Sequence, residues 1–194
     1  MRWKSLAPVS FLIGVFVSAV AVSALGQVPA EKTGEVRNGT YENSFFGLTY
    51  TPASDLKFNT SELTAGKAYT ERTFILFSAW EDQKPGAVRK GIVADADRLS
   101  DYSEGHRDVE SYVNRVTRNQ ISQGYEVVGE KKQRQLGKLT FLEADFKRAP
   151  ASEAILVTAR DGYAIVLIFN ASNPDDLDHL ISTCQIVFAD ETKR

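Results

Sequence analysis

Cysteine and histidine are almost absent from this chain of 194 residues. It holds one cysteine, Cys184, and two histidines, His106 and His179. A single cysteine excludes an internal disulfide, so the packing of the core has to supply the stability. One cysteine and two histidines are too few to assemble a zinc-binding spacing or a Ser–His–Asp order. We therefore expect no catalytic residue, no cofactor and no metal.

An excess of positive charge is also lacking. The chain has 23 lysines and arginines against 25 aspartates and glutamates, a formal charge of −2. Residues 1–26 hold Arg2 and Lys4 and no acid, so the remainder is more acidic still. Proteins that bind nucleic acid usually present a basic face. We expect no nucleic-acid partner, and the basic run at 130–134 indicates a solvated strand end or turn.

A long uncharged hydrophobic stretch is present at the N-terminus. Residues 6–25 follow a basic start, contain no charged residue and end in small residues such as Ala21 and Ala24. This order is typical of a secretory signal peptide over residues 1–26, cleaved after Gly26 or after Ala21. The alternative is an uncleaved anchor, because about 20 apolar residues span a bilayer. Both place the rest outside the cytoplasm, periplasmic or secreted, with a membrane tether through residues 6–25 in the second case.

Beyond this segment the sequence predicts a single domain. Residues 27–40 are polar, contain a proline and two glycines, and indicate a flexible leader, so the domain is expected at 41–190. Apolar runs predict strands at 45–51, 73–80 and 91–94, the second of them central and covered on both faces.

A change to helical spacing follows. Val109, Tyr112, Val113 and Val116 recur every three or four residues, which predicts a helix over 108–123 with Asp108 as its N-cap. Alternating apolar residues then predict strands at 125–130 and 139–147.

The last third carries the clearest local signals. Two apolar runs, 153–160 and 163–170, flank Asp161 and Gly162, a pair that favours a type I′ hairpin turn. A helix capped by Ser172 or Asn173 follows, and a final strand covers 185–189. Strands in neighbouring hairpins with helices between them indicate an α+β domain, a mostly antiparallel sheet covered by helices.

Two segments resemble a known family. Residues 46–52 (FGLTYTP) resemble the start of PsbP-like domains, and residues 162–169 (GYAIVLIF), followed by an acidic-capped helix and 186–188 (IVF), resemble their end. The resemblance covers roughly residues 41–190. It implies an α/β/α sandwich with a central antiparallel sheet, and a role that is mostly non-enzymatic, as in photosystem subunits and bacterial envelope proteins. It transfers no functional residue.

Few residues stand out as candidates for chemistry. Asp95, Asp97, Asp101 and His106 could supply metal ligands, but the glycine and the closing acid of a calcium loop are misplaced, so a solvated loop is expected. The strand at 139–147 carries the remaining acids of interest, Glu143 and Asp145, on one face. They could form an acid–base pair, although a solvated outer face is expected.

Three further side chains are expected to have ordinary structural roles. Cys184 is expected to be a buried thiol, His179 to stabilise a helix end, and Trp80 to lie at the edge of the core, with an exposed interface role as the alternative.

Three functions remain open from the sequence. The first is a non-catalytic binding or accessory module of the cell envelope, contacting a protein partner or holding a small ligand between sheet and helix. The second is an extracytoplasmic hydrolase with an unrecognised site, and the third is a membrane-tethered structural domain. An enzyme should place His106 or a carboxylate pair in a hollow with shifted pKa values, whereas a binding module should expose an apolar patch near Trp80.

Overall fold

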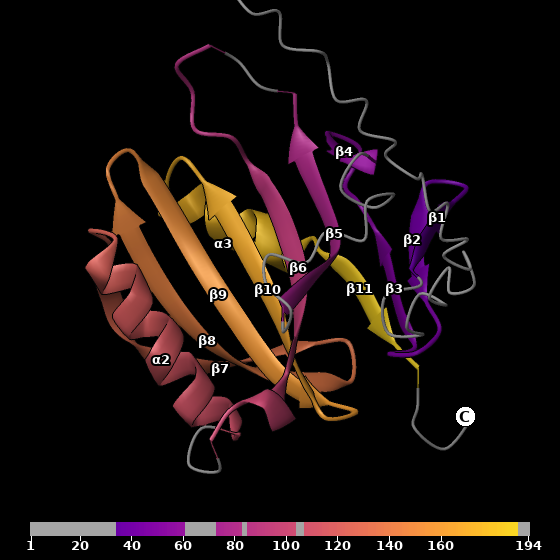
Figure 1. Ribbon diagram of the computed structural model, residues 1–194. Helices are drawn as coiled ribbons and strands as arrows, with labels where there is room; N and C mark the ends of the chain where they lie inside the picture. Colours follow the sequence, from indigo (N-terminus) through magenta and orange to yellow (C-terminus); the bar gives the residue numbers. More distant parts are fainter. Residues whose placement is uncertain (1–33, 61–72, 83–84, 104–106, 190–194) are drawn as a thin grey trace, which may run out of the picture.

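The computed structural model describes residues 34–60, 73–82, 85–103 and 107–189 (Figure 1). These residues form strands joined by short turns, with two α-helices and one 3-10 helix. The strands are β1 (Glu35–Arg37), β2 (Thr40–Asn43), β3 (Leu48–Thr51), β4 (Leu56–Phe58), β5 (Thr73–Glu81), β6 (Gly91–Arg98), β7 (Glu126–Leu136), β8 (Leu139–Arg148), β9 (Ala151–Arg160), β10 (Tyr163–Ala171) and β11 (Gln185–Phe188). The helices are η2 (Leu99–Asp101), α2 (Val109–Ser122) and α3 (Pro174–Ser182).

Seven strands form one antiparallel sheet in the order β4-β5-β6-β10-β9-β8-β7. Hairpins supply most of the pairs, and β10 joins the two halves by pairing with β6. β9 and β10 are buried at nearly every position because both faces of the sheet are covered there. Their continuous apolar sequences therefore reflect their central place in the sheet.

A second, four-stranded sheet has the order β1-β2-β3-β11. It joins distant parts of the chain, since Ile186 of β11 lies opposite Tyr50 of β3. It packs on the larger sheet through aromatic side chains: the ring of Tyr50 stacks on Phe77 of β5 with centroids 4.4 Å apart, and Phe188 lies 6.1 Å from Phe141 of β8.

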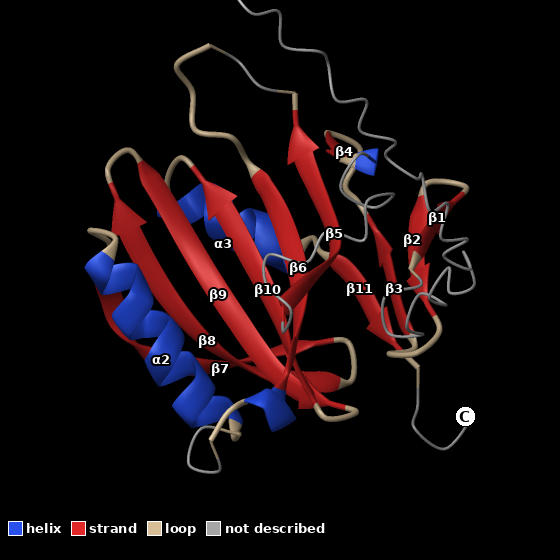
Figure 2. Ribbon diagram, in the orientation of Figure 1, coloured by secondary structure: helices blue, strands red, loops and turns tan. Residues whose placement is uncertain are grey.

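The α/β/α sandwich predicted from the sequence is wrong. Strands dominate the fold (Figure 2). One face of the seven-stranded sheet carries α2, but the other carries the four-stranded sheet together with the short α3, so there is no second helical layer in the described residues. The strands near 45–51 and 185–189 were correctly expected as strands. Their apolar pattern shows that each is half buried, but it does not specify the partner strand.

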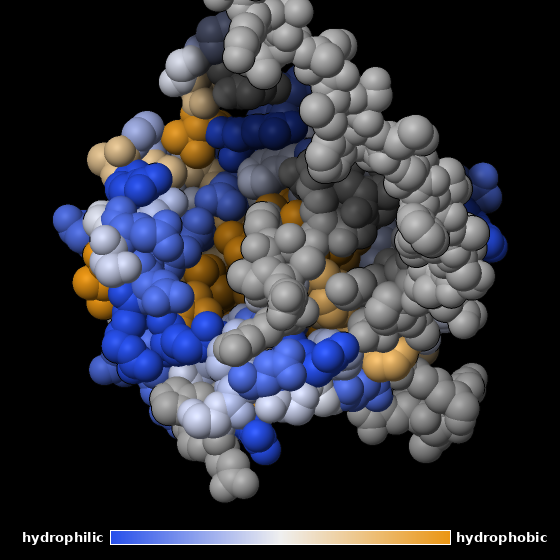
Figure 3. All heavy atoms as spheres, viewed as in Figure 1, coloured by the Kyte–Doolittle hydropathy of each residue, from blue (hydrophilic) through white to orange (hydrophobic). Residues whose placement is uncertain are grey.

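The larger sheet separates two hydrophobic cores. On one side, Tyr112 and Val113 of α2 pack over Phe146, Val157 and Val166, while the outer side of α2 is polar (Figure 3). The other side holds the larger core, which is rich in aromatic rings. Burial of each large apolar side chain contributes roughly 1.5–3 kcal/mol, so the domain needs no disulfide. The fully buried aromatic residues of this larger core are Tyr41, Phe46, Tyr50, Phe77, Phe141 and Phe169.

Several local predictions are confirmed. Asp161 and Gly162 have φ values of 51° and 81°, the two positive angles that a type I′ turn requires. The Asp108 carboxylate accepts a hydrogen bond from the amide of Ser111 and begins α2, and the Asn173 side chain accepts one from the amide of Asp176 and begins α3.

Several boundaries differ from the prediction. β1 and the first residue of β2 lie within residues 27–40, where the sequence indicated a flexible leader. Residues 45–47 form a turn rather than part of β3. β6 continues to Arg98 and β7 continues to Leu136. Both strands therefore include polar residues that had been expected in turns and loops.

The N-terminal predictions concern residues that the structure does not describe. Residues 1–26, including the proposed tether at 6–25, and residues 27–33 of the leader lie outside the described ranges. Within those ranges, no helix combines the length and the apolar character needed to cross a membrane.

Candidate functional site

A groove runs between α3 and the edge formed by β7 and β8. At the N-terminal end of α3 it contains a hollow of about 340 Å³, walled mainly by apolar residues such as Val128, Pro150 and Leu177. A second, wider hollow of about 600 Å³ continues toward the C-terminal end of the helix. We call the two together the α3 groove. The second hollow is lined by polar residues: Lys132, Gln133, Arg134, Gln135, Asp178, His179 and Ser182.

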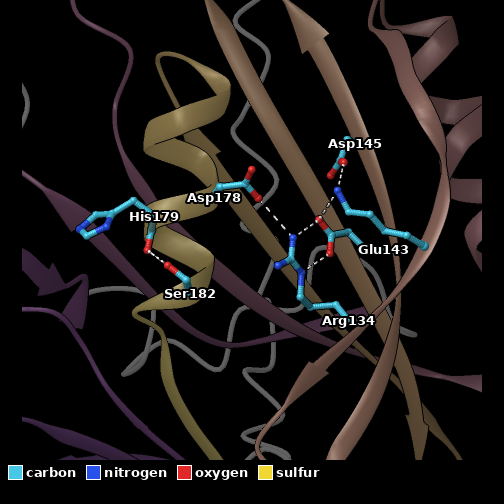
Figure 4. A network of polar contacts seen from close by, with 7 residues as sticks. Arg134, Glu143, Asp145, Asp178, His179 and Ser182 are labelled. Atoms are coloured by element: carbon cyan, nitrogen blue, oxygen red, sulfur yellow. Dashed lines mark hydrogen bonds and ion pairs between the residues drawn. The ribbon is translucent and has the colours of Figure 1, made fainter.

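The two hollows meet at a network of ion pairs (Figure 4). Glu143 of β8 is only 1% exposed, and Arg134 donates to it twice, Nε to Oε2 at 2.6 Å and Nη2 to Oε1 at 3.1 Å. The same Nη2 reaches Asp178 of α3 at 3.2 Å. Arg134 therefore ties the sheet to the helix across the groove.

Lys132 completes the network on the side of the apolar hollow. Its Nζ lies 2.5 Å from Asp145 Oδ2 and 3.2 Å from Glu143 Oε1. Lys132 and Asp145 both line the apolar hollow, so one end of that hollow is polar. A mainly apolar cavity with a few converging polar groups is the usual form of a ligand-binding site.

The two carboxyl groups of β8 have pKa values shifted in opposite directions. Burial alone raises the pKa of Glu143, but hydrogen bonds from Arg134 and Lys132 outweigh it and lower the value below the usual range. Burial raises the pKa of Asp145, and the neighbouring charge of Glu143 adds to the increase against the opposing bond from Lys132. The environment thus separates the pair into one firmly ionised carboxylate and one that takes up a proton more readily.

The solvated outer face predicted for Glu143 and Asp145 is wrong: Glu143 is buried and Asp145 is half-buried, beside the hollow that α3 borders. The sequence did carry a signal for the network. Lys132 and Arg134 lie two residues apart on one face of β7, and Glu143 and Asp145 lie two residues apart on one face of β8. The turn at Gly137 joins the two strands, and Leu136 pairs with Leu139 across it. Extending the strand at 125–130 to that turn would have placed Lys132 opposite Glu143.

The described part of the acidic segment, residues 95–103, begins in a buried strand rather than in the solvated loop that the sequence predicted. Asp95 and Asp97 belong to β6 and are buried. Asp97 accepts hydrogen bonds from Thr73 Oγ1 at 2.8 Å, Tyr102 Oη at 2.5 Å and Tyr112 Oη at 2.8 Å. Its role is to fasten β5, β6 and α2 together.

No metal-ligand cluster of three or more acids, histidines or cysteines occurs in the part of the chain that the structure describes. Asp101 accepts a hydrogen bond from Ser100 at the surface, and His106 lies outside the described residues. The absence of catalytic, cofactor-binding and metal residues stays a prediction.

The remaining candidates occupy structural positions. Burial raises the pKa of the Cys184 thiol to about 12, so the thiol is protonated at neutral pH and is a poor nucleophile. His179 lies in the last turn of α3. Trp80 is half-buried, with the Arg89 guanidinium 4.9 Å from its ring centroid.

Among the described residues, no exposed apolar patch lies near Trp80. The large hydrophobic residues that are most exposed in the described ranges are Ile121, Val127, Val128 and Val187.

Comparison with known proteins identifies the fold alone. No family model and no curated protein matches the sequence. The solution structure of cyanobacterial PsbP (CyanoP) from Synechocystis sp. PCC 6803 is similar, with a TM-score of 0.51 and 11% identity over 77% of this chain and 91% of that one. The fold is PsbP-like. A crystal structure from Bacteroides thetaiotaomicron shares 11% identity over 76% of this chain and 47% of that one, and its TM-score of 0.38 is too low to support an argument.

Proposed function

We propose that this chain is an exported, non-catalytic binding or accessory module of the cell envelope that holds an apolar ligand or partner segment in the α3 groove. The observation that carries the proposal is the apolar hollow of about 340 Å³ between sheet and helix. Ligand sites in proteins begin at about 300 Å³ and combine apolar walls with a few fixed polar groups. The PsbP-like fold is compatible with an accessory role, although a fold does not determine a function.

The ion-pair network supports binding because it makes the groove rigid. Arg134 of β7 is paired with Glu143 of β8 and Asp178 of α3, so a fixed set of contacts links the two walls of the α3 groove. A cavity that exists before the ligand arrives avoids the entropic cost of forming it. The polar end at Lys132 and Asp145 would orient a ligand that carries one polar group.

Export is the second part of the proposal and rests on residues 1–26. We propose that this segment is a signal peptide and that the domain works in the periplasm or outside the cell, with a tethered structural domain as the alternative if residues 6–25 are retained. The intact mass of the protein from its own cells separates the two. A mass that begins at Gln27 supports cleavage, and one that begins at Met1 in the membrane fraction supports the tether.

Native mass spectrometry of gently purified protein tests the binding function. The wild type is expected to carry a bound mass. Val128→Trp, which fills the mouth of the hollow, should lose it, and Val187→Trp should keep it, because Val187 is a similarly exposed valine on the other sheet. A bare wild type, or a bound mass that survives in Val128→Trp, would contradict the proposal.

One observation favours the second candidate, a hydrolase. Asp145 and Glu143 form a carboxylate pair at the groove with pKa values shifted apart, an arrangement that acid–base catalysis uses. A panel of chromogenic ester, peptide and glycoside substrates tests it. Hydrolysis by the wild type that disappears in Asp145→Asn, with the fold intact by circular dichroism, would establish an enzyme; no turnover with any substrate class favours the binding module.

A further inference from the structure

β7 is the last strand in the order of the larger sheet, and among the described residues β8 is its partner strand. An edge strand presents backbone N–H and C=O groups that another extended chain can pair with. This edge borders the apolar hollow of the α3 groove, so a ligand class assigned to the edge rests on the proposed function and makes it more specific.

Two hollows flank the same short part of β7, one on each face of the sheet. Val128 lines the apolar hollow on the α3 side. Val127 lines a separate hollow of about 380 Å³ on the α2 side, together with Thr117 and Ala144. The two valines, Val127 and Val128, are 43% and 41% exposed. Apolar atoms are also visible at the surface beside α2 (Figure 3).

The geometry of the two hollows matches an extended peptide. Neighbouring side chains of a strand point to opposite faces, as Val127 and Val128 do through their partners Phe146 and Asp145. A strand added to β7 would place one side chain in each hollow in the same way. A compact small molecule in the α3 groove would contact only one of them.

Lysine side chains often protect an edge strand from pairing with another chain, but the two lysines of β7 are held against the faces of the sheet instead. Lys131 Nζ donates to Asn114 Oδ1 at 2.8 Å on the α2 side, and Lys132 is held by Asp145 on the α3 side. The pairing between β7 and β8 shifts register between Val128 and Lys132, and Gly129 has a φ of 71°. This bulge separates the regular stretch at 126–128, which lies between the two hollows, from the regular stretch at 132–136.

We propose that β7 binds an extended peptide segment by strand addition along residues 126–128, with two adjacent apolar side chains of the peptide in the two flanking hollows. Backbone hydrogen bonds supply the affinity in this mode of recognition, and the pockets supply the selectivity.

Selection from a phage-displayed library of random nonapeptides against the purified protein tests the proposal. Enriched peptides should contain two neighbouring apolar residues. For one synthetic peptide, fluorescence polarisation should show about tenfold weaker binding to Val127→Lys, because a pocket contact is lost. Binding to Val187→Lys, the matched surface variant, should be unchanged. N-methylation of alternate peptide amides should also weaken binding about tenfold, because it removes backbone donors and keeps every side chain.

The outcomes separate strand addition from the proposed function. Strand addition is overturned if the library yields no enriched peptides. It is also overturned if N-methylation leaves the affinity of the peptide unchanged. A dimer of this chain that Val127→Lys dissociates overturns it as well, because the edge would then serve a second copy. If strand addition fails while wild type still carries a bound mass that Val128→Trp loses, the α3 groove remains a small-ligand site. If no bound mass is found either, both proposals fall.

Discussion

Glu153 gives the sharpest prediction of how stability depends on pH. It lies on β9 and is only 5% exposed, and its Oε1 accepts a hydrogen bond from Gln120 Nε2 of α2 at 2.6 Å. Burial raises its pKa from 4.5 to about 7, against the smaller opposing effects of Arg148 and Gln120. The carboxyl group is therefore ionised in the unfolded chain at pH values where the folded protein still holds it protonated.

The size and sign of the effect follow from this difference. Each pH unit between the unfolded and folded pKa is worth about 1.4 kcal/mol, so ionised Glu153 costs about 3 kcal/mol. Its stability contribution is complete below pH 4.5, is lost as the pH rises toward 7, and stays lost above 7. Glu153→Gln keeps the shape and the hydrogen-bond acceptor without the charge. At pH 8 its free energy of unfolding should therefore exceed that of the wild type by about 3 kcal/mol.

Urea unfolding at pH 4, 6 and 8 and constant ionic strength measures the difference between Glu153→Gln and wild type. The difference should be close to zero at pH 4 and should grow to its full value by pH 8. Glu42→Gln, at an exposed position of β2, should show no such growth. A difference that does not change with pH would refute the reasoning, because it would mean that Glu153 has a similar pKa in both states.

Three other changes test the network and the turns. Glu143→Ala should lower the free energy of unfolding by about 2–3 kcal/mol by leaving Arg134 without its buried partner, whereas Arg37→Ala, in an exposed pair, should hardly change it; equal effects in urea would contradict this. Tyr112→Phe should cost about 1–2 kcal/mol through the lost bond to Asp97, visible as a lower melting temperature. Gly162→Ala should cost about 1 kcal/mol, because its φ is 81°; an unchanged denaturation midpoint would argue against the type I′ turn.

The features predicted correctly from the sequence are those that depend only on residues close together in the chain. The turn at Asp161 and Gly162 needs two positive φ angles, and the caps at Asp108 and Asn173 need one side-chain oxygen near a free amide. These are local requirements that particular residue types meet. The strands at 73–80 and 139–147 were likewise evident from their apolar patterns.

The missed features depend on contacts between distant residues. The pairing of β3 with β11 brings Tyr50 beside Ile186, and no local pattern specifies it. Asp97 was assigned to a loop because acids are rare in buried strands, yet the hydroxyl groups of Thr73, Tyr102 and Tyr112 satisfy it. The α3 groove also depends on where α3 packs, so the sequence suggested a ligand between sheet and helix without locating it.

The pairing of β3 with β11 also sets the order in which the domain can be completed. The four-stranded sheet cannot close over the larger core until residues 185–188 have been synthesised, because β11 is one of its edge strands. Before then Tyr50 lacks its neighbour Ile186 and Phe141 lacks its contact with Phe188, so the growing chain stays short of its native state. If residues 1–26 direct export, this delay would keep the chain unfolded for transport across the membrane, with completion on the far side.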